Sequence, residues 1–319
     1  MPLFLSEKEV EKLLTMPLAL AAVEAAHRDL ASMQACDMPR QRTRLPQTTL
    51  HILQGALPQL DVIGYKAYTS NRSGVRFLVH LYRASSGSLR AVLEADRLGM
   101  MRTGAAAGVA TRWLARSDAR VAGVFGAGWQ AEGHLEAIAA VRPLQRIKVY
   151  ARHAERLAAF CKRMSARLAL EVVAVASPEE VVRGSDIVST VTTSATPLFD
   201  ADWLAPGTHI NAAGSNSLIR RELGEDVIKR CSPIVVDSVA TALCEAGDLL
   251  PLLEKGRLHA RQLIELGDVI CGRQAGRSTL DEITLFESQG MAVQDLAVAV
   301  TLEDLAREHG FGVELPYGA

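Results

Sequence analysis

The 319-residue chain has almost no excess of charge of either sign. Its 35 lysines and arginines stand against 36 aspartates and glutamates, which leaves a formal net charge of −1. Without a basic excess the chain offers no general attraction to nucleic-acid phosphates, so we expect no DNA or RNA partner. Hydrophobic residues make up 49% of the chain and charged residues 22%, proportions that exclude wholesale disorder and indicate a folded globular protein.

Long hydrophobic runs are missing as well. The sequence contains no run of about 18 apolar residues, so it predicts no transmembrane helix. The opening segment, residues 1–14, is acidic and amphipathic, whereas a secretory signal peptide has a basic segment followed by an apolar one. We therefore expect a cytoplasmic protein with no membrane partner.

Cysteines are few and scattered. Their number is odd, and none of them forms a C-x-x-C pair or a Cys/His cluster with zinc-binding spacing. The sequence therefore predicts reduced thiols, no disulfide framework and no metal site. The five positions are Cys36, Cys161, Cys231, Cys244 and Cys271.

The pattern of expected strands and helices changes at Ala119. Before it, after helical segments at the start, strand character is found at residues 47–54, 61–69, 76–82 and 89–93, and a helix is expected at 103–114. Beyond it, strands alternate with helices, and these strands are expected at residues 120–125, 146–150, 171–175, 186–191 and 208–212. Such alternation is typical of βαβ units and a parallel sheet.

At about 150 residues per domain, the length suggests two domains. We predict an α/β protein with a Rossmann-type parallel-sheet domain at residues 119–289, which binds a dinucleotide. A second, α+β domain is expected to comprise residues 1–118 together with 290–319, because the helix expected at 292–308 returns to it.

A glycine-rich loop follows the first strand of the parallel sheet. Residues 126–131 read G-A-G-W-Q-A and open a helix. Gly126 allows the tight turn, Gly128 lets the backbone approach a pyrophosphate, and Ala131 lets the helix pack closely on the strand. The amide groups at the helix start then point toward the anion. The loop predicts a dinucleotide site.

The residues after the second strand select the cofactor. An NAD site usually carries Asp or Glu there to bind the ribose 2′-hydroxyl, but this chain has Arg152 and His153 and no acid. Arg152 can pair with a 2′-phosphate, with His153 assisting, which favours NADP(H) and leaves NAD(H) possible. The alternative is a solvated arginine at the end of a strand.

The first domain contains conspicuous basic residues. A cation within an apolar strand, as at Lys66, is costly to bury unless it is paired, and a ligand carboxylate is one suitable partner. The alternatives are exposure at a sheet edge or internal salt bridges to Glu94 or Asp96. The basic residues are Arg42, Arg44, Lys66 and Arg102.

Other polar residues are interpreted as structural. His80 and His134 are expected to pack in a core or interface, and Asp295 to cap or brace a helix near the site. Glu222, Glu225 and Asp226 are expected to form a solvated helix face.

Seven short motifs occur in a fixed order along nearly the whole chain. They are Arg42-Thr43, Gly64-Tyr65-Lys66, M-R-T-G-A-A at residues 101–106, G-A-G-W-Q-A at 126–131, N-A-A-G-S-N at 211–216, E-L-G-D at 265–268 and G-M-A-V-Q-D at 290–295. Together they resemble the ornithine cyclodeaminase/μ-crystallin family.

The resemblance implies a homodimer in which the first domain pairs across subunits and binds an amino-acid or imino-acid substrate. It implies that Arg42, Lys66 and Arg102 hold the substrate α-carboxylate. The cofactor-binding residues, including those already derived from the loop and the second strand, are Thr103, Gly126, Gly128, Trp129, Gln130, Arg152, His153, Thr192, Thr193 and Val293.

One departure from the family pattern bears on the reaction. Cyclodeaminases carry an aspartate in the loop after the Asn-Ala-x-Gly strand, where it handles the substrate amine, and here that position is Asn216. Asn cannot accept a proton as a carboxylate does, although it can orient an amine or water by hydrogen bonds. Cyclodeaminases also have an acid after the second strand, which is missing here.

These differences favour an NADP(H)-dependent reductase of small ketimines or cyclic imino acids, or the reverse amino-acid dehydrogenase. Lys66 is then the candidate proton donor, and Asn216 the second candidate catalytic residue. One alternative is ornithine cyclodeaminase, which is NAD-linked and forms proline and ammonia. A second alternative is a non-catalytic protein that binds NADPH and a small ligand.

Overall fold

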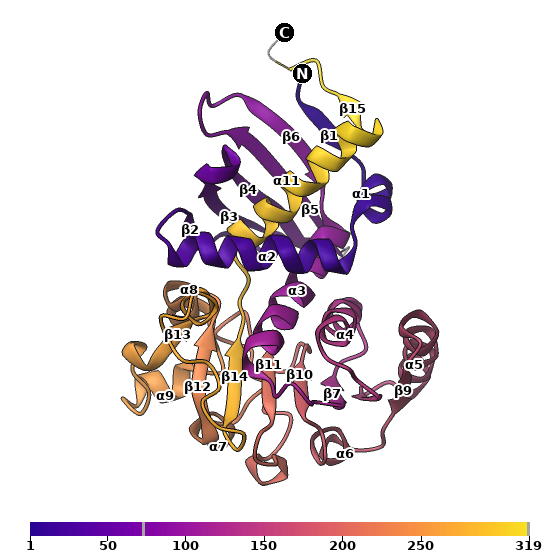
Figure 1. The fold of residues 1–319 in the computed structure, drawn as a ribbon, viewed down its shortest axis with the longest axis vertical. Coiled ribbons are helices and arrows are strands. Elements are labelled where there is room, and N and C mark those ends of the chain that lie inside the picture. Colours follow the sequence, from indigo (N-terminus) through magenta and orange to yellow (C-terminus); the bar gives the residue numbers. More distant parts are fainter. Residues whose placement is uncertain (72–73, 318–319) are drawn as a thin grey trace. The chain divides into compact units, whose positions relative to one another are not determined.

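The computed structural model describes residues 1–71 and 74–317, and the chain divides into two compact units (Figure 1). Unit 1 comprises Met1–Arg102 and Met291–Ala319, and unit 2 comprises Thr103–Gly290. The first boundary expected from the sequence, at 118/119, lies sixteen residues beyond this division (118 − 102 = 16), because the division falls inside a helix that the sequence assigns to one domain.

Unit 1 contains a mixed sheet of seven described strands in the order β15-β1-β6-β5-β4-β3-β2. Neighbouring strands are antiparallel except β1 and β6, which are parallel. The strands are β1 (Leu3–Leu5), β2 (Cys36–Arg44), β3 (Thr49–Leu57), β4 (Val62–Asn71), β5 (Gly74–Arg83), β6 (Leu89–Glu94) and β15 (Val313–Glu314).

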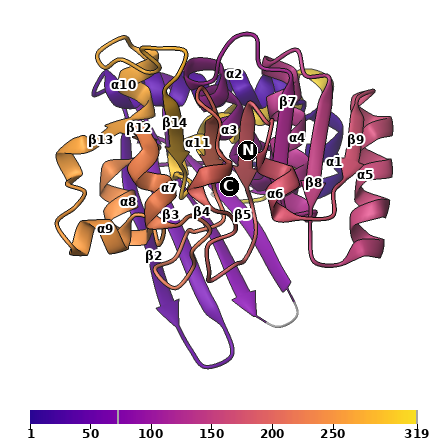
Figure 2. The same ribbon diagram turned by 90° about the horizontal axis from the view of Figure 1, so that it is seen from below.

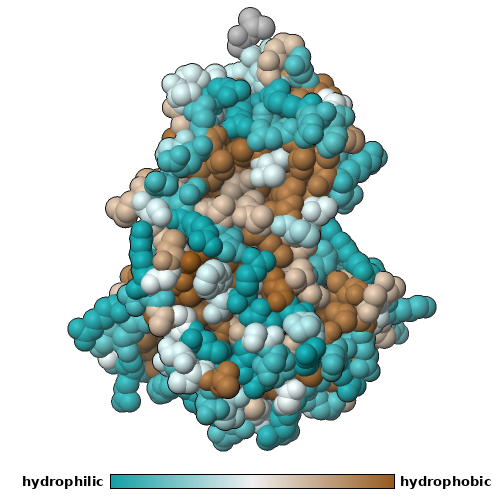
Figure 3. Space-filling model, viewed as in Figure 1, coloured by the Kyte–Doolittle hydropathy of each residue, from teal (hydrophilic) through white to brown (hydrophobic). Residues whose placement is uncertain are grey.

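Two helices cover one face of this sheet. Helix α11 (Ala292–His309) packs on β3, β4 and β5, and α2 (Met16–Ala31) crosses α11 (Figure 1). Hydrophobic residues remain visible around these helices, framed by hydrophilic ones (Figure 3). Helix α1 (Glu7–Leu13) begins with a capping box between Ser6 and Glu9.

Side chains on the covered face are buried, and those on the other face are not. Along β4, Val62 and Lys66 are buried, whereas Ile63 is 50% exposed, as expected for the two-residue period of a strand.

Unit 2 contains a parallel sheet of eight described strands, which confirms the predicted α/β class. Its order is β13-β12-β14-β11-β10-β7-β8-β9. The strands are β7 (Val121–Phe125), β8 (Arg146–Tyr150), β9 (Glu171–Ala174), β10 (Ile187–Thr190), β11 (His209–Ala212), β12 (Cys231–Val236), β13 (Leu263–Glu265) and β14 (Ile283–Glu287).

Helices flank this sheet, with α8 and α9 toward its β13 side and α5 beside β9 (Figure 2). Helix α3 (Asp96–Leu114) continues across the unit boundary. The other helices are α4 (Trp129–Val141), α5 (Ala154–Leu168), α6 (Pro178–Val182), α7 (Glu225–Arg230), α8 (Val239–Glu245), α9 (Leu250–Glu254) and α10 (Leu266–Ile270). No helix of the described segments is both long and apolar enough to cross a membrane.

Candidate functional site

In unit 1, two of the predicted substrate-binding cations form ion pairs with the same carboxylate, that of Asp295. Lys66 lies on β4, Arg102 on α3 and Asp295 in the first turn of α11. The Lys66 Nζ is 2.8 Å from Asp295 Oδ1 and 2.7 Å from Oδ2, and Arg102 Nε donates to the same Oδ1 at 2.9 Å. Lys66 is only 2% exposed and Asp295 0%, so these groups form a buried triad.

The acid that pairs with Lys66 is neither of the two that the sequence analysis considered, Glu94 and Asp96. Glu94 instead accepts a hydrogen bond from the backbone N–H of Glu7 at 2.7 Å, and Asp96 pairs with the exposed Arg76 at 2.8 Å. Exposure at a sheet edge is also excluded, because β4 is an interior strand. Asp295, expected to cap or brace a helix near the site, is instead the buried partner of both cations.

Two cations that share one anion leave the triad with a formal charge of +1. Burial and the Arg102 charge together lower the pKa of Lys66 to about 7, against the opposing effect of Asp295. On its other side Arg102 donates to Gln294 Oε1 at 2.9 Å, which fixes the guanidinium. A buried surplus of positive charge with a fixed arginine is suited to bind a carboxylate ligand.

The third predicted cation, Arg42, lies on β2 opposite His51 of β3. Burial, together with the charges of Arg42, Arg40 and Arg44, lowers the pKa of His51 to about 4. Arg40 is the arginine of β2 whose charge also lowers the pKa of Lys66. Arg40 was not predicted from the sequence, although it lies two residues before Arg42, a spacing that indicates the same face of one strand.

The loop after β7 in unit 2 has the geometry expected of a dinucleotide loop. Gly126 has a φ of +114°, and a Cβ there would lie 2.9 Å from the carbonyl oxygen of Val191. Gly128 is the N-cap of α4, has no side-chain cap, and has no atom within 4 Å of the place a Cβ would take. The open N-terminus of α4 therefore fits a pyrophosphate.

The predicted cofactor residues near this loop differ in exposure. Trp129 is 46% exposed, and the buried Oε1 of Gln130 has no hydrogen-bond partner among the described residues. Arg152 and His153 follow β8, the strand beside β7, and both are exposed. The Arg152 side chain makes no hydrogen bond or ion pair with the described part of the chain, so it is available to a ligand phosphate.

The loops after β10 and β11 carry three further predicted residues. The backbone N–H of Thr192 donates to Glu222 Oε1 at 2.6 Å, the carbonyl of Thr193 accepts from Arg220, and Asn216 is exposed. The structure thus places these residues at the carboxyl ends of neighbouring strands, where ligands bind in open parallel sheets.

Glu222 was expected on a solvated helix face, and that expectation is wrong. Its side chain is 0% exposed and lies before α7 rather than on it. Its backbone N–H donates to Asp248 Oδ1 at 2.6 Å, which fixes it inside the unit. Asp226, on α7, is exposed as expected.

Two predicted cofactor residues lie apart from the glycine loop in sequence. Thr103 is the first residue of unit 2 and is half-buried on α3. Val293 belongs to unit 1, where its side chain is buried beside Gly55 and its N–H donates to Asp37 at 3.0 Å. Their roles remain predictions.

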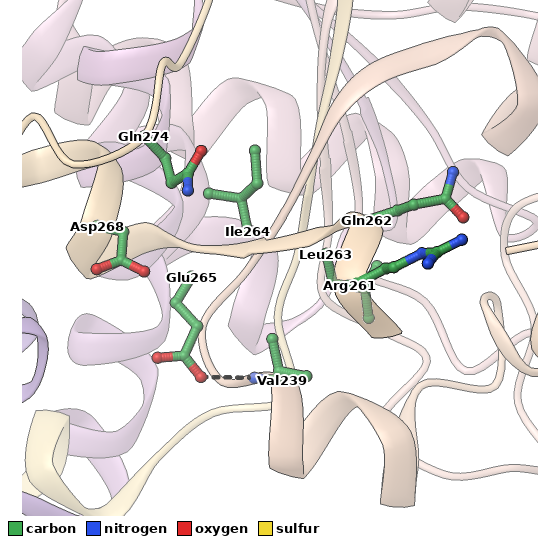
Figure 4. A pocket seen from close by; sticks show the side chains of 8 residues that line it. All are labelled: Val239, Arg261, Gln262, Leu263, Ile264, Glu265, Asp268 and Gln274. Carbon is green, nitrogen blue, oxygen red and sulfur yellow. Dashed lines mark hydrogen bonds between the residues drawn. The ribbon is translucent and has the colours of Figure 1, made fainter. Parts of the chain in front are cut away.

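A separate cavity of about 450 Å³ lies at the edge strand β13 (Figure 4). Glu265 in its wall accepts a hydrogen bond from the N–H of Val239 at 3.0 Å. The strands β12, β14, β11 and β10 separate this edge from β7, so the cavity is distinct from the glycine loop. Within residues 1–71 and 74–317, no three His, Cys, Asp or Glu residues are grouped to hold a metal ion.

Comparison with known proteins identifies the family. The model described as "Ornithine cyclodeaminase/mu-crystallin family" matches residues 1–310. A Delta(1)-pyrroline-2-carboxylate reductase from Bacillus cereus is 36% identical over 279 residues, which cover 85% of this chain and 86% of the relative.

Two solved structures share the whole fold. The Thermococcus litoralis Delta(1)-pyrroline-2-carboxylate reductase in complex with NADH and L-proline has a TM-score of 0.94 at 31% identity, covering 98% of this chain and 100% of that one. An archaeal alanine dehydrogenase dimer with bound NAD has a TM-score of 0.93 at 30% identity and covers 99% of both chains. With the motifs, the fold and the full-length match in agreement, the chain belongs to the ornithine cyclodeaminase/mu-crystallin family.

Proposed function

We propose that the protein reduces small α-imino acids to amino acids with NADPH, and that cyclic imino acids are among its substrates. The observation that carries this proposal is the buried pair of Lys66 and Arg102 on the single carboxylate of Asp295. A substrate carboxylate completes the charge balance of this cluster. The same residues serve the reverse oxidation of the amino acid.

Each cation has its own task. Arg102 binds the substrate carboxylate with the guanidinium that Gln294 and Asp295 orient, and Arg42 assists from β2. Lys66 Nζ holds the proton that the imine nitrogen needs, because its pKa of about 7 allows it to be charged or neutral near physiological pH. Asn216 orients the nitrogen by hydrogen bonds.

Unit 2 supplies the cofactor residues. A bound nicotinamide dinucleotide supplies the hydride for the imine carbon. Gly126 and Gly128 admit its pyrophosphate at the start of α4, and the exposed Arg152 pairs with a 2′-phosphate, with His153 beside it. Arg152 is the reason that we propose NADPH over NADH.

The relatives support the imine-reducing reaction over ammonia release. The Bacillus cereus and Thermococcus litoralis relatives are both named Delta(1)-pyrroline-2-carboxylate reductase. Asn216 also lacks the carboxylate that the family resemblance associates with the amine-handling step of cyclodeaminases. Both considerations favour reduction of a preformed imine.

We also propose that two copies associate through the open face of the unit 1 sheet. Ile63 is 50% exposed and Leu78 37% on the face that α11 leaves uncovered; on the same two strands Tyr82 lies opposite Ile63, and Tyr65 lies between this pair and Leu78. Apolar side chains gathered on a sheet face are typical of an interface. The archaeal alanine dehydrogenase with this fold is a dimer.

The decisive experiment follows oxidation of NADPH and of NADH with a panel of imines. The panel contains pyrroline-2-carboxylate, piperideine-2-carboxylate and pyruvate with methylamine or ammonia, and ornithine with NAD is tested for proline and ammonia. We expect NADPH oxidation with at least one imine. Proline from ornithine without imine reduction would establish a cyclodeaminase, and saturable NADPH binding without any turnover would indicate a binding protein.

A further inference from the structure

Glu222 bridges two loops of unit 2 with its two carboxylate oxygens. Oε1 accepts the backbone N–H of Thr192 at 2.6 Å, and Oε2 accepts the backbone N–H of Gly214 at 2.9 Å. The side chain is 0% exposed. Hydrogen bonds from N–H groups to a buried carboxylate are among the stronger ones in proteins, so this bridge constrains both loops.

The two bridged loops extend from neighbouring parallel strands. Thr190 at the end of β10 is in register with Ala212 at the end of β11. The first loop continues to Thr193 and the second to Asn216. Glu222 thus sets the separation of two segments at the edge of the sheet where ligands bind.

The close approach of the second loop explains its glycine. A Cβ on Gly214 would lie 2.2 Å from Glu222 Oε2 and 2.5 Å from the carbonyl oxygen of Thr192. The carboxylate therefore occupies the space that a side chain at position 214 would need. Glycine at position 214 is therefore required by the position of the Glu222 carboxylate.

The backbone of Glu222 is in turn fixed by hydrogen bonds to Asp248. Asp248 Oδ1 accepts the N–H of Glu222 at 2.6 Å and that of Leu223 at 3.0 Å. The N–H of Asp248 donates to Ser215 Oγ at 3.1 Å, and Ser215 Oγ donates to Glu287 Oε1 at 3.3 Å. The loop that carries Asn216 is thus tied to a chain of buried acids by three hydrogen bonds, one at Gly214 and two at Ser215.

We infer that Glu222 is a positioning residue for the reaction, which holds the Thr192–Thr193 loop and the Gly214–Asn216 loop at the separation that cofactor and substrate need. The inference deepens the proposed function and rests on it, because Asn216 orients the substrate nitrogen there and Thr192 and Thr193 are predicted cofactor residues. Glu222 does not touch the reacting atoms.

The charge state of Glu222 makes the bridge sensitive to pH. Its pKa is raised to about 7, mainly by burial and also by the Asp248 charge, against the lowering effect of the hydrogen bonds from Thr192. Asp248 and Glu287 are the other acids of this chain, the charge of Asp237 acts on Glu287, and the charge of Arg221 acts on Asp248. The ionised carboxylate accepts both N–H groups, whereas protonation converts one oxygen to a donor and weakens one tie. Activity is therefore expected to fall as the pH drops below about 7.

The test is Glu222→Gln, which keeps the shape and leaves one oxygen as acceptor. Turnover of the best imine is expected to fall about 10- to 100-fold, with the KM for the dinucleotide raised and the acid limb of the pH profile lost. Thermal unfolding of the variant is recorded in parallel. Glu225→Gln, three residues along the chain on α7, is the matched control: its half-buried carboxylate pairs with Lys255 and Lys229 and not with the two loops, so its kinetics should match those of wild type.

The outcomes separate this inference from the proposed function. If Glu222→Gln equals Glu225→Gln in kcat, KM and pH profile, or loses activity only in proportion to its unfolded fraction, Glu222 has no positioning role. If wild type reduces no imine, the proposed function fails. The bridge is then tested by dinucleotide titration, where weaker binding by Glu222→Gln supports it and equal binding overturns it.

Discussion

The lysine of the buried triad combines two properties that rarely occur together, complete burial and a neighbouring arginine. Since both lower its pKa, to about 7, Lys66 loses its proton in the physiological range. If its ammonium group supplies the proton for imine reduction, kcat should fall as pH rises through about 7.

Replacement of Lys66 by Met tests this role. Lys66→Met should retain dinucleotide binding, since the glycine loop and Arg152 belong to unit 2, and should lose about 10²- to 10⁴-fold in kcat, together with the alkaline limb of the pH profile. Lys229→Met, on exposed α7, is the control. Initial rates measured across the pH range would show the loss in kcat and of the alkaline limb. Full turnover by Lys66→Met would exclude Lys66 as the proton donor.

Arg152 offers a second test at the residue scale. It is exposed and has no ion pair with the described residues, so its removal should leave folding unchanged. Arg152→Ala should raise the KM for NADPH about 10- to 100-fold and leave that for NADH nearly unchanged, because only NADPH carries the 2′-phosphate. Arg156→Ala, one turn along on α5, is the matched control. Equal losses with both cofactors would contradict the assigned role.

At the scale of elements, the glycine loop contains two glycines that serve different purposes. Gly126 needs its positive φ to make the turn, whereas Gly128 has ordinary backbone angles and an open space in front of it. The same substitution at the two positions should therefore have different effects.

Gly126→Ala should lower the free energy of unfolding by about 1–2 kcal/mol and weaken dinucleotide binding. Gly128→Ala should unfold at the wild-type temperature and still bind the dinucleotide weakly, because its methyl group meets the pyrophosphate. Thermal unfolding and fluorescence titration of Trp129 measure both quantities. Wild-type affinity in Gly128→Ala would show that no phosphate approaches this loop.

Five of the eight described parallel strands, β7 to β11, were predicted from sequence, whereas β12, β13 and β14 were not. The strand expected at 146–150 is β8 with the same bounds, and the other four expected strands agree with β7, β9, β10 and β11 to within one residue at each end. These segments are short, apolar and separated by clear turns. By contrast, β2 (Cys36–Arg44) was missed, because an edge strand with Pro39 and alternating arginines lacks the apolar pattern.

The site was predicted less completely than the fold, for a physical reason. Lys66 and Arg102 could be named from sequence, but their counter-ion Asp295 lies 229 residues beyond Lys66 in the chain. Likewise Glu222 has the residue type and spacing of a surface acid, and only tertiary hydrogen bonds from Thr192 and Gly214 make it internal. Such pairings join residues far apart in the chain, so the local sequence pattern around each residue does not predict them.

At the scale of the whole molecule, the open sheet face of unit 1 predicts the oligomeric state. Ile63→Asp places a charge in the apolar face of the proposed dimer and should shift the protein from dimer to monomer in light scattering. Leu280→Asp introduces the same charge at an exposed site of unit 2 and should leave the dimer intact. A dimer that persists in Ile63→Asp would place the interface elsewhere.

The position of α11 also has a consequence for synthesis on the ribosome. This helix comes from the end of the described chain, yet it fills the core of the unit that contains the first strands. Unit 2 is complete by Gly290, so it is expected to fold while α11 is still being made. Until α11 emerges, the nascent chain carries Lys66 and Arg102 without their shared carboxylate. The sheet of unit 1 can therefore complete its core only after α11 has been made.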